Sequence, residues 1–187
     1  MVQYARPDGH HSDGVGNWDN GSEFSPSQAN LHLLIDESST DDSDIIKSSD
    51  EGSSSTARFT LGDVGDPESD ADHKVIYRAV GTGGMGATPA LTVTLLQGSA
   101  AVVVASTNSS LGNTAGWPGD SYATYTITLS SDQASGIVDY DSLSIKLTRA
   151  AGEMGDSVQV SQLYFECPDE AAAAATTSPA FLLFTGM

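Results

Sequence analysis

The stretch Ser121–Phe165 decides the fold, and it reads SYATYTITLSSDQASGIVDYDSLSIKLTRAAGEMGDSVQVSQLYF. Two runs within it alternate apolar and polar residues. The apolar members of these runs are Tyr125, Ile127, Leu129, Leu143, Ile145 and Leu147. Alternation with a period of two places the apolar side chains on one face of a strand. The stretch therefore predicts two half-buried strands, which need a second layer of structure to be stable.

A short helix is expected between these two strands. Ser130-Ser131-Asp132-Gln133 has the capping-box pattern, in which the serine and glutamine side chains each accept from the other residue's backbone N–H. Ala134, Ile137 and Val138 then follow at helical spacing. The pattern predicts one or two helical turns that join the strands.

A third strand is expected after residue 156, and its apolar residues change parity along the run. Val158 and Val160 face one way, whereas Leu163 and Phe165 have the opposite parity. One extra residue between the two pairs would return all four side chains to a common face. We therefore predict a β-bulge near Ser161-Gln162.

The rest of the chain predicts further short strands separated by turn residues. These strands are expected over residues 31–35, 45–46, 57–61, 74–80, 91–95 and 101–105. Residues 74–80 are apolar on both parities, which is typical of a strand buried on both faces. With the strands above, the pattern predicts an all-β fold of about eight strands, a two-sheet antiparallel β-sandwich of jelly-roll type.

The two ends of the chain differ from the middle in composition. Residues 1–30 are rich in Gly, Asp, Asn, Ser and Pro and predict an N-terminal loop or arm, which Trp18 would anchor. Residues 31–168 form the predicted sandwich domain, and residues 169–187 predict a C-terminal arm interrupted by Pro179. The arm ends in the apolar residues Phe181, Leu182, Leu183 and Phe184. These residues must dock, either on a neighbouring molecule or on the sandwich itself.

The charge balance excludes several classes of partner. The 187 residues include 25 Asp and Glu against 7 Lys and Arg, which gives a formal net charge of -18. A chain this acidic repels phosphate groups, so we expect neither nucleic-acid binding nor docking on an anionic membrane surface. The longest strictly apolar run, residues 100–105, is far shorter than the roughly 18 residues that a membrane helix needs. No signal-peptide pattern is expected at the N-terminus.

No motif predicts catalysis, a cofactor or a metal. Residues 81–86 match G-x-G-x-x-G, but a strand and not a helix is expected after them, which disfavours a dinucleotide site. The acidic clusters at residues 41–44 and 63–72 lack EF-hand spacing; they favour solvated surface, with calcium binding as the open alternative. Glu166 and Asp169 flank Cys167, and their charge disfavours a reactive thiolate. The sequence thus predicts a protein that is not an enzyme and holds no cofactor.

Several short motifs follow one another in a distinctive order. They are Arg6-Pro7-Asp8, Trp18, Ile35-Asp36-Glu37, Asp41-Asp42-Ser43-Asp44-Ile45, Ala57-Arg58-Phe59, Asp66-Pro67, Val75-Ile76-Tyr77-Arg78, Leu91-Thr92-Val93 and Leu95-Leu96-Gln97-Gly98. This order resembles that of small virion proteins of tailed bacteriophages, over Arg6 to Glu166. The resemblance implies a β-sandwich with a structural role, and it leaves capsid decoration, head fibre and tail positions open.

The resemblance and the composition lead to one main hypothesis and one alternative. We expect a non-enzymatic capsid decoration or cement protein on the outside of the head, made in the host cytoplasm. Its partners would be the major capsid protein, copies of itself, or both, and Trp18 and residues 181–184 would contact them. The alternative is a carbohydrate-binding or adaptor β-sandwich of a phage tail or fibre, in which Trp117 would stack on a glycan.

Overall fold

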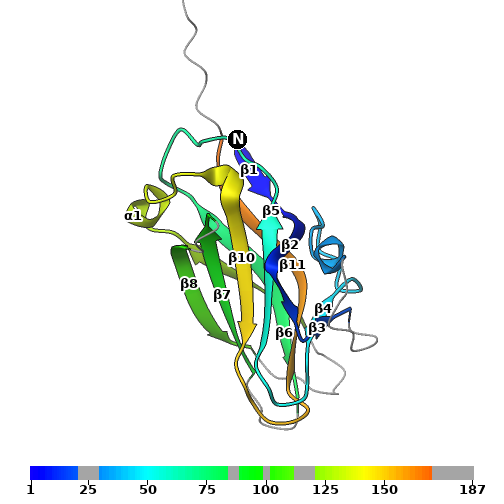
Figure 1. The fold of residues 1–187 in the computed structure, drawn as a ribbon. Coiled ribbons are helices and arrows are strands. Elements are labelled where there is room, and N and C mark those ends of the chain that lie inside the picture. Colours follow the sequence, from blue (N-terminus) through cyan, green and yellow to red (C-terminus); the bar gives the residue numbers. More distant parts are fainter. Residues whose placement is uncertain (21–29, 84–88, 99–101, 112–120, 170–187) are drawn as a thin grey trace, which may run out of the picture.

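The computed structural model describes residues 1–20, 30–83, 89–98, 102–111 and 121–169. Two antiparallel sheets pack face to face in it, with helical segments at their margins (Figure 1). Both sheets draw strands from the beginning, the middle and the end of the chain. The predicted two-sheet antiparallel β-sandwich is therefore confirmed.

The chain passes repeatedly between the two sheets. Sheet A consists of β1 (Val2–Ala5), β3 (Trp18–Asp19), β4 (Ile46–Ser48), β6 (Lys74–Thr82), β9 (Ala123–Thr128) and β11 (Ser157–Pro168). Sheet B consists of β2 (Pro7–Gly16), β5 (Ser55–Leu61), β7 (Ala90–Gln97), β8 (Val102–Ser110) and β10 (Leu143–Arg149). The helical segments are η1 (Leu31–Leu34), α1 (Ser131–Ala134) and η2 (Tyr140–Ser142).

One strand is central in each sheet. In sheet A, β11 pairs with β6 along one edge, and along the other edge with β4 near its start and with β1 near its end. In sheet B, β10 lies between β5 and β7. The inner faces share one hydrophobic core, which contains the five residues that the sequence places together: Leu129, Leu143, Ile145, Leu147 and Phe165.

The predicted β-bulge is present in β11. The pairing of β11 with β6 shifts between Val160 and Gln162, which leaves Ser161 as the extra residue. Val160 before the bulge and Leu163 after it are both fully buried. The bulge therefore keeps the apolar side chains of both halves of the strand in one core.

The helical turn also lies where the capping box predicts it. The Ser130 side chain accepts from the Gln133 backbone N–H at 3.3 Å, and Gln133 Oε1 accepts from the Ser130 N–H at 2.9 Å. Ala134 and Ile137 are buried, but Val138 is 85% exposed. The helical spacing fails at Val138 because α1 has already ended at Ala134.

The loop that composition predicts over residues 1–30 is wrong for residues 2–19. β1 pairs with β11, β2 with β5, and β3 with β4. The Gly- and Asp-rich sequence is tolerated because β2 is an edge strand with two register shifts, where regular pairing and apolar alternation are relaxed.

The strand predicted over residues 31–35 is instead the 3-10 helix η1. Leu31 and Ile35 are fully buried, whereas Leu33 is 54% exposed. A 3-10 helix has three residues per turn, so Leu31 and the partly buried Leu34 share its inner face, whereas a strand that buries Leu31 and Ile35 would bury Leu33 as well. The Ile35 carbonyl accepts from the Leu163 N–H at 2.9 Å, so the end of η1 satisfies backbone of β11 that neither β1 nor β4 reaches.

Candidate functional site

The outer faces of the two sheets carry different kinds of side chain. On sheet B, a hollow that we call the Arg58 pocket is lined by His11, Arg58, Thr60, Gly98, Asp141, Ser142, Leu143 and Ser144. On sheet A, a surface that we call the tyrosine face carries Tyr4, Tyr122 and Tyr164 with Arg6, Asp42, Lys74, Arg78, Gln159 and Glu166. Both regions combine side chains of paired strands with side chains of the turns and loops beside them.

Strand alternation builds the Arg58 pocket. Arg58 lies between the core residues Ala57 and Phe59, so its side chain leaves the core on the outer face of sheet B. Ser144 leaves the core in the same way from β10, and the register of β5 and β10 sets it opposite Thr60. Pairing of neighbouring strands thus brings these polar side chains together.

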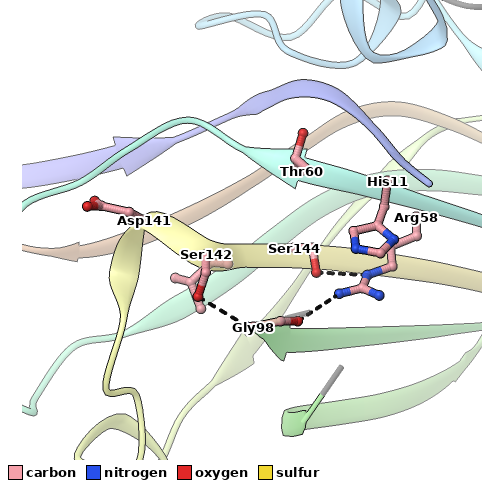
Figure 2. Close-up of a pocket in the computed structure, with 8 residues that line it drawn as sticks. His11, Arg58, Thr60, Gly98, Asp141, Ser142 and Ser144 are labelled. Atoms are coloured by element: carbon pink, nitrogen blue, oxygen red, sulfur yellow. Dashed lines mark hydrogen bonds between the residues drawn. The ribbon is translucent and has the colours of Figure 1, made fainter. Parts of the chain in front are cut away.

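Arg58 lies across the pocket and is only 3% exposed. Its Nε donates to Ser144 Oγ at 2.9 Å, and its Nη2 donates to the Gly98 carbonyl at 3.3 Å. Figure 2 shows the His11 imidazole from β2 beside the guanidinium group. The guanidinium is therefore held in one orientation by two strands and a turn.

Hydroxyl groups line the rest of the pocket. Ser142 Oγ accepts from the Gly98 N–H at 3.2 Å and donates to the Asp139 carbonyl at 3.2 Å. Thr60 Oγ1 donates to Asp8 Oδ1 at 2.6 Å. Gly98 has φ 68°, a left-handed conformation that glycine adopts without strain, and it turns its carbonyl toward Arg58. Since a hydroxyl has one hydrogen and two lone pairs, these groups keep capacity for a ligand.

The pocket combines hydrogen-bond donors and acceptors with apolar wall surface, and Leu143 is among its lining residues. Its volume is about 230 Å³, below the roughly 300–1,000 Å³ of clefts that hold drug-sized ligands. No group of three or more His, Cys, Asp or Glu that could hold a metal ion is found in the described part of the chain. The arrangement therefore suits one small polar ring or group.

A second hollow lies on the other side of the β7–β8 turn. Its volume is about 310 Å³, and its lining residues are Gln97, Val103, Val104, Asp132, Gln133 and Gly136. The Gln97 side chain donates to the Gly136 carbonyl at 2.7 Å and accepts from the Val138 N–H at 3.0 Å. These bonds fix the turn against the segment after α1, and with it the Gly98 carbonyl of the Arg58 pocket.

The tyrosines of sheet A lie among charged groups that are already paired. Tyr4 is 45% exposed, and its ring meets Tyr164 edge-on at 5.9 Å between centroids. The Arg6 guanidinium carbon lies 5.4 Å from the centre of the Tyr4 ring, a cation–π contact. Beside them, Lys74 Nζ donates to Glu166 Oε1 at 2.8 Å. Each charged group here is engaged by a neighbour on the same face.

The same holds at the other end of the tyrosine face. Arg78 donates to both carboxylate oxygens of Asp42, at 2.7 and 2.6 Å, and Ser161 Oγ donates to the same carboxylate at 2.8 Å. The Arg78 hydrogen bonds hold the pKa of Asp42 below its usual range. Tyr122 donates to Gln159 Oε1 at 2.6 Å, and burial raises the pKa of Tyr122 to about 12. This network ties the residue 36–44 segment to β11 at its bulge.

The residues that the sequence proposes for partner binding do not form one site. Trp18 is an anchor as expected, but it is 0% exposed in the core, so its ring is not at the surface where a partner would meet it. Trp117 and residues 181–184 lie outside the described residues. Cys167 is buried, and burial raises the pKa of its thiol to about 11.

The alternation of apolar and polar residues does indicate that Arg58 and Tyr164 point outward, although the sequence analysis did not propose them as site residues. Arg58 and Tyr164 each lie between two inward apolar residues, so alternation alone directs them outward. This alternation could not show that His11, Arg58 and Ser142 meet, because that depends on how β2, β5 and β10 pair. In the described part of the chain, no helix is long and apolar enough to span a membrane.

No family model and no curated protein matches the chain. Solved structures do match its fold. One is TmCBM61 in complex with β-1,4-galactotriose, with a TM-score of 0.41 and 11% sequence identity, covering 88% of this chain and 86% of that chain. Another is the carbohydrate-binding module TmCBM27, described for its specific mannan recognition, with a TM-score of 0.42 and 9% identity, covering 89% of this chain and 98% of that chain.

Proposed function

We propose that this chain is a non-enzymatic carbohydrate-binding β-sandwich whose Arg58 pocket holds one sugar residue. The observation that carries the proposal is the composition of the pocket wall. Three hydroxyl groups, a guanidinium, an imidazole, a carboxylate and a backbone carbonyl surround a hollow of about 230 Å³. Each sugar hydroxyl both donates and accepts a hydrogen bond, so its site must offer both kinds of partner.

The wall is divided between donors and acceptors in a way that suits a polyol. The Arg58 guanidinium is a planar array of donors, and the exposed Asp141 carboxylate and the Gly98 carbonyl are acceptors. Most of these groups lie on or beside paired strands and are already oriented by hydrogen bonds. A preorganised wall loses little conformational entropy when a ligand binds.

The same wall supports binding over hydrolysis. Enzymes that cleave glycosidic bonds use a pair of carboxyl groups on either side of the scissile bond. Among the described residues that line the Arg58 pocket, Asp141 is the one carboxylate. The pocket therefore fits a module that holds a sugar without cutting it.

A glycan array followed by calorimetric titration tests the proposal. Arg58→Gln should weaken binding of the best glycan by at least about tenfold, because a charge-assisted donor contributes roughly 1.5–3 kcal/mol. Lys146→Gln is the matched control. Lys146 lies directly opposite Arg58 on β10 and does not line the pocket, so this substitution removes one positive charge from the same face of the sheet and leaves the pocket wall unchanged.

Asp141→Asn gives a second test that does not depend on a buried side chain. Asp141 is exposed, so its replacement should leave the melting temperature unchanged and weaken glycan binding several-fold. The proposal is wrong if no glycan binds, or if binding survives both Arg58→Gln and Asp141→Asn.

A capsid decoration protein is the second candidate, and one observation favours it. Asp42 and Arg78 come from two separate motifs that carry the resemblance to phage virion proteins, and they form a bidentate ion pair. The ion pair joins two of the motifs on which the resemblance rests. Pelleting the protein with undecorated capsids tests this candidate, and many copies per virion would favour the shell over the tail.

A further inference from the structure

Charge is distributed very unevenly along this chain. The chain has 25 acidic and 7 basic residues, yet residues 79–131 contain a single charged side chain, that of Asp120, and no histidine. The acidic character of the molecule therefore comes almost entirely from the residues before and after this stretch. An uncharged segment of this length in so acidic a chain calls for a physical reason.

The described strands of the uncharged segment lie on one side of the sandwich. The segment supplies β7, β8 and β9, of which β8 is the edge strand of sheet B and β9 the edge strand of sheet A. These two edges lie on the same side of the molecule and contact each other. We call the surface formed by β8 and β9 the uncharged side; β8 is labelled at the margin of the sandwich in Figure 1.

The edge of β8 lacks the usual protection against pairing with another chain. An edge strand presents unpaired N–H and C=O groups, and natural proteins protect such edges with charged side chains, proline or short length. β8 spans 9 residues, VVVASTNSS, with neither charge nor proline, and its Val103 is 60% exposed. The opposite edge of sheet B, β2, contains Pro7 and Asp8.

We propose that the uncharged side is the interface with a second copy of this chain, through antiparallel pairing of β8 with the β8 of the copy. Every copy carries the same charge of -18, so two copies repel wherever their carboxylates face each other. The described residues of β8 and β9 carry no carboxylate, and Asp132 of α1 lies beside Val103 and Val104, so the repulsion on this side is smaller than elsewhere on the molecule. Antiparallel self-pairing of one strand satisfies twofold symmetry, and its backbone hydrogen bonds supply affinity without charged contacts.

The proposal predicts how the affinity of the dimer changes with salt concentration. Added salt screens the repulsion between the two acidic molecules but leaves uncharged hydrogen bonds and apolar contacts in place. Dimerisation should therefore strengthen from low to moderate salt. An interface built from ion pairs would weaken over the same range.

Sedimentation equilibrium of the full chain, at low and at moderate salt, tests the proposal. Ser106 on β8 is exposed, so Ser106→Asp and Ser106→Lys leave the fold intact but should each weaken the dimer at least about tenfold, because like charges then face each other across the new strand pair. The lysine variant is informative because it lowers the net negative charge. Thr148→Asp, on the central strand β10 and the same outer face, is the control and should leave the dimer unchanged.

Three results would overturn the proposal. The first is a chain that stays monomeric at every concentration and salt. The second is a dimer that survives both Ser106 variants, and the third is equal weakening by Thr148→Asp.

Discussion

On the tyrosine face, Arg78 donates to both oxygens of Asp42 and Lys74 donates to Glu166, so the charged groups satisfy one another. In the Arg58 pocket, by contrast, side chains from β2, β5 and the start of β10 surround a hollow of about 230 Å³. Both regions carry polar side chains from paired strands and from the segments that flank them. The difference teaches that a binding site is marked by polar groups that converge on open volume, and not by their number.

The largest expected effect concerns the core that both faces share. Ile145 is fully buried on β10, next to Ser144 of the pocket. Ile145→Ala should lower the free energy of unfolding by roughly 2–5 kcal/mol, from lost transfer energy and the cavity left behind. Urea unfolding measures this loss, and Ile145→Val, at about 0.5–1.5 kcal/mol, is the graded control. A loss far below the range would show that the face assignment of β10 is wrong.

The tyrosine face should respond in stability and not in binding. Arg78→Gln removes the bidentate contact to Asp42 and should cost about 1 kcal/mol, since both groups are partly exposed. Glycan binding should stay unchanged. Lys47→Gln, in an exposed pair with 3.9 Å between Lys47 Nζ and Asp50 Oδ2, should cost less than about 0.5 kcal/mol. Loss of glycan binding in Arg78→Gln would erase the contrast between the two faces.

Acid should weaken the core before it weakens the tyrosine face. His73 is fully buried, with its Nδ1–H donating to the Ala71 carbonyl and its Nε2 accepting from the Tyr140 hydroxyl. Burial lowers the pKa of His73 from its ordinary value of 6.5. The unfolded chain therefore takes up a proton at a higher pH than the folded chain, so stability is full above pH 6.5 and falls as the pH drops below it.

The fold favours the charged form of Asp42, whereas it favours the neutral form of His73, and Asp42 titrates at a lower pH. Its pKa is held below the ordinary value of 3.8, so its contribution is present above that pH and is lost only as the pH falls through the lowered pKa. Melting temperatures from pH 8 down to pH 3 should therefore fall in two stages, each of a few degrees. His73→Gln should reduce the first stage, to which His10 also contributes because burial lowers its pKa too, and Asp42→Asn should reduce the second. A single fall below pH 4 in the unmodified chain would contradict the assignment to His73.

The smallest effect on stability is expected at the C-terminus. Deletion of residues 180–187, which lie outside the described residues, removes Phe181, Leu182, Leu183 and Phe184. If this segment binds a partner, the melting temperature should be nearly unchanged while partner binding weakens. If the segment caps its own sandwich, the truncated protein should melt much lower and still bind its partner.

The sequence predicts those elements whose strands have one clearly buried face. β9, β10 and β11 were all accessible from alternation, and the change of parity between Val160 and Leu163 even locates the bulge. The same reasoning failed for η1, because its leucines occupy both parities and fit a strand or a helix equally well. It failed for residues 2–19 because short edge strands carry few apolar residues.

Apolar alternation along the sequence predicts neither the full burial of Trp18 in the core nor the convergence of the residues that line the Arg58 pocket. Asn17, with φ 62°, turns the chain from β2 in sheet B to β3 in sheet A, and the Ser49 N–H donates to the Asn17 carbonyl at 2.8 Å. That crossing sends Trp18 into the core from a segment whose composition suggests a loop. The pocket likewise depends on the pairing of strands that are far apart in sequence, which alternation does not report.

The position of β11 late in the sequence also determines the order in which the two sheets can form during synthesis. Sheet B can close once Arg149 has left the ribosome, because all of its strands precede that point. Sheet A must wait for β11, which is the partner of β1, β4 and β6 and ends at Pro168. Val2 pairs with Pro168, so β1 stays without its partner until Pro168 has been made. Such long-range pairing makes folding slow, and the nascent chain must carry an open sheet until its last strand arrives.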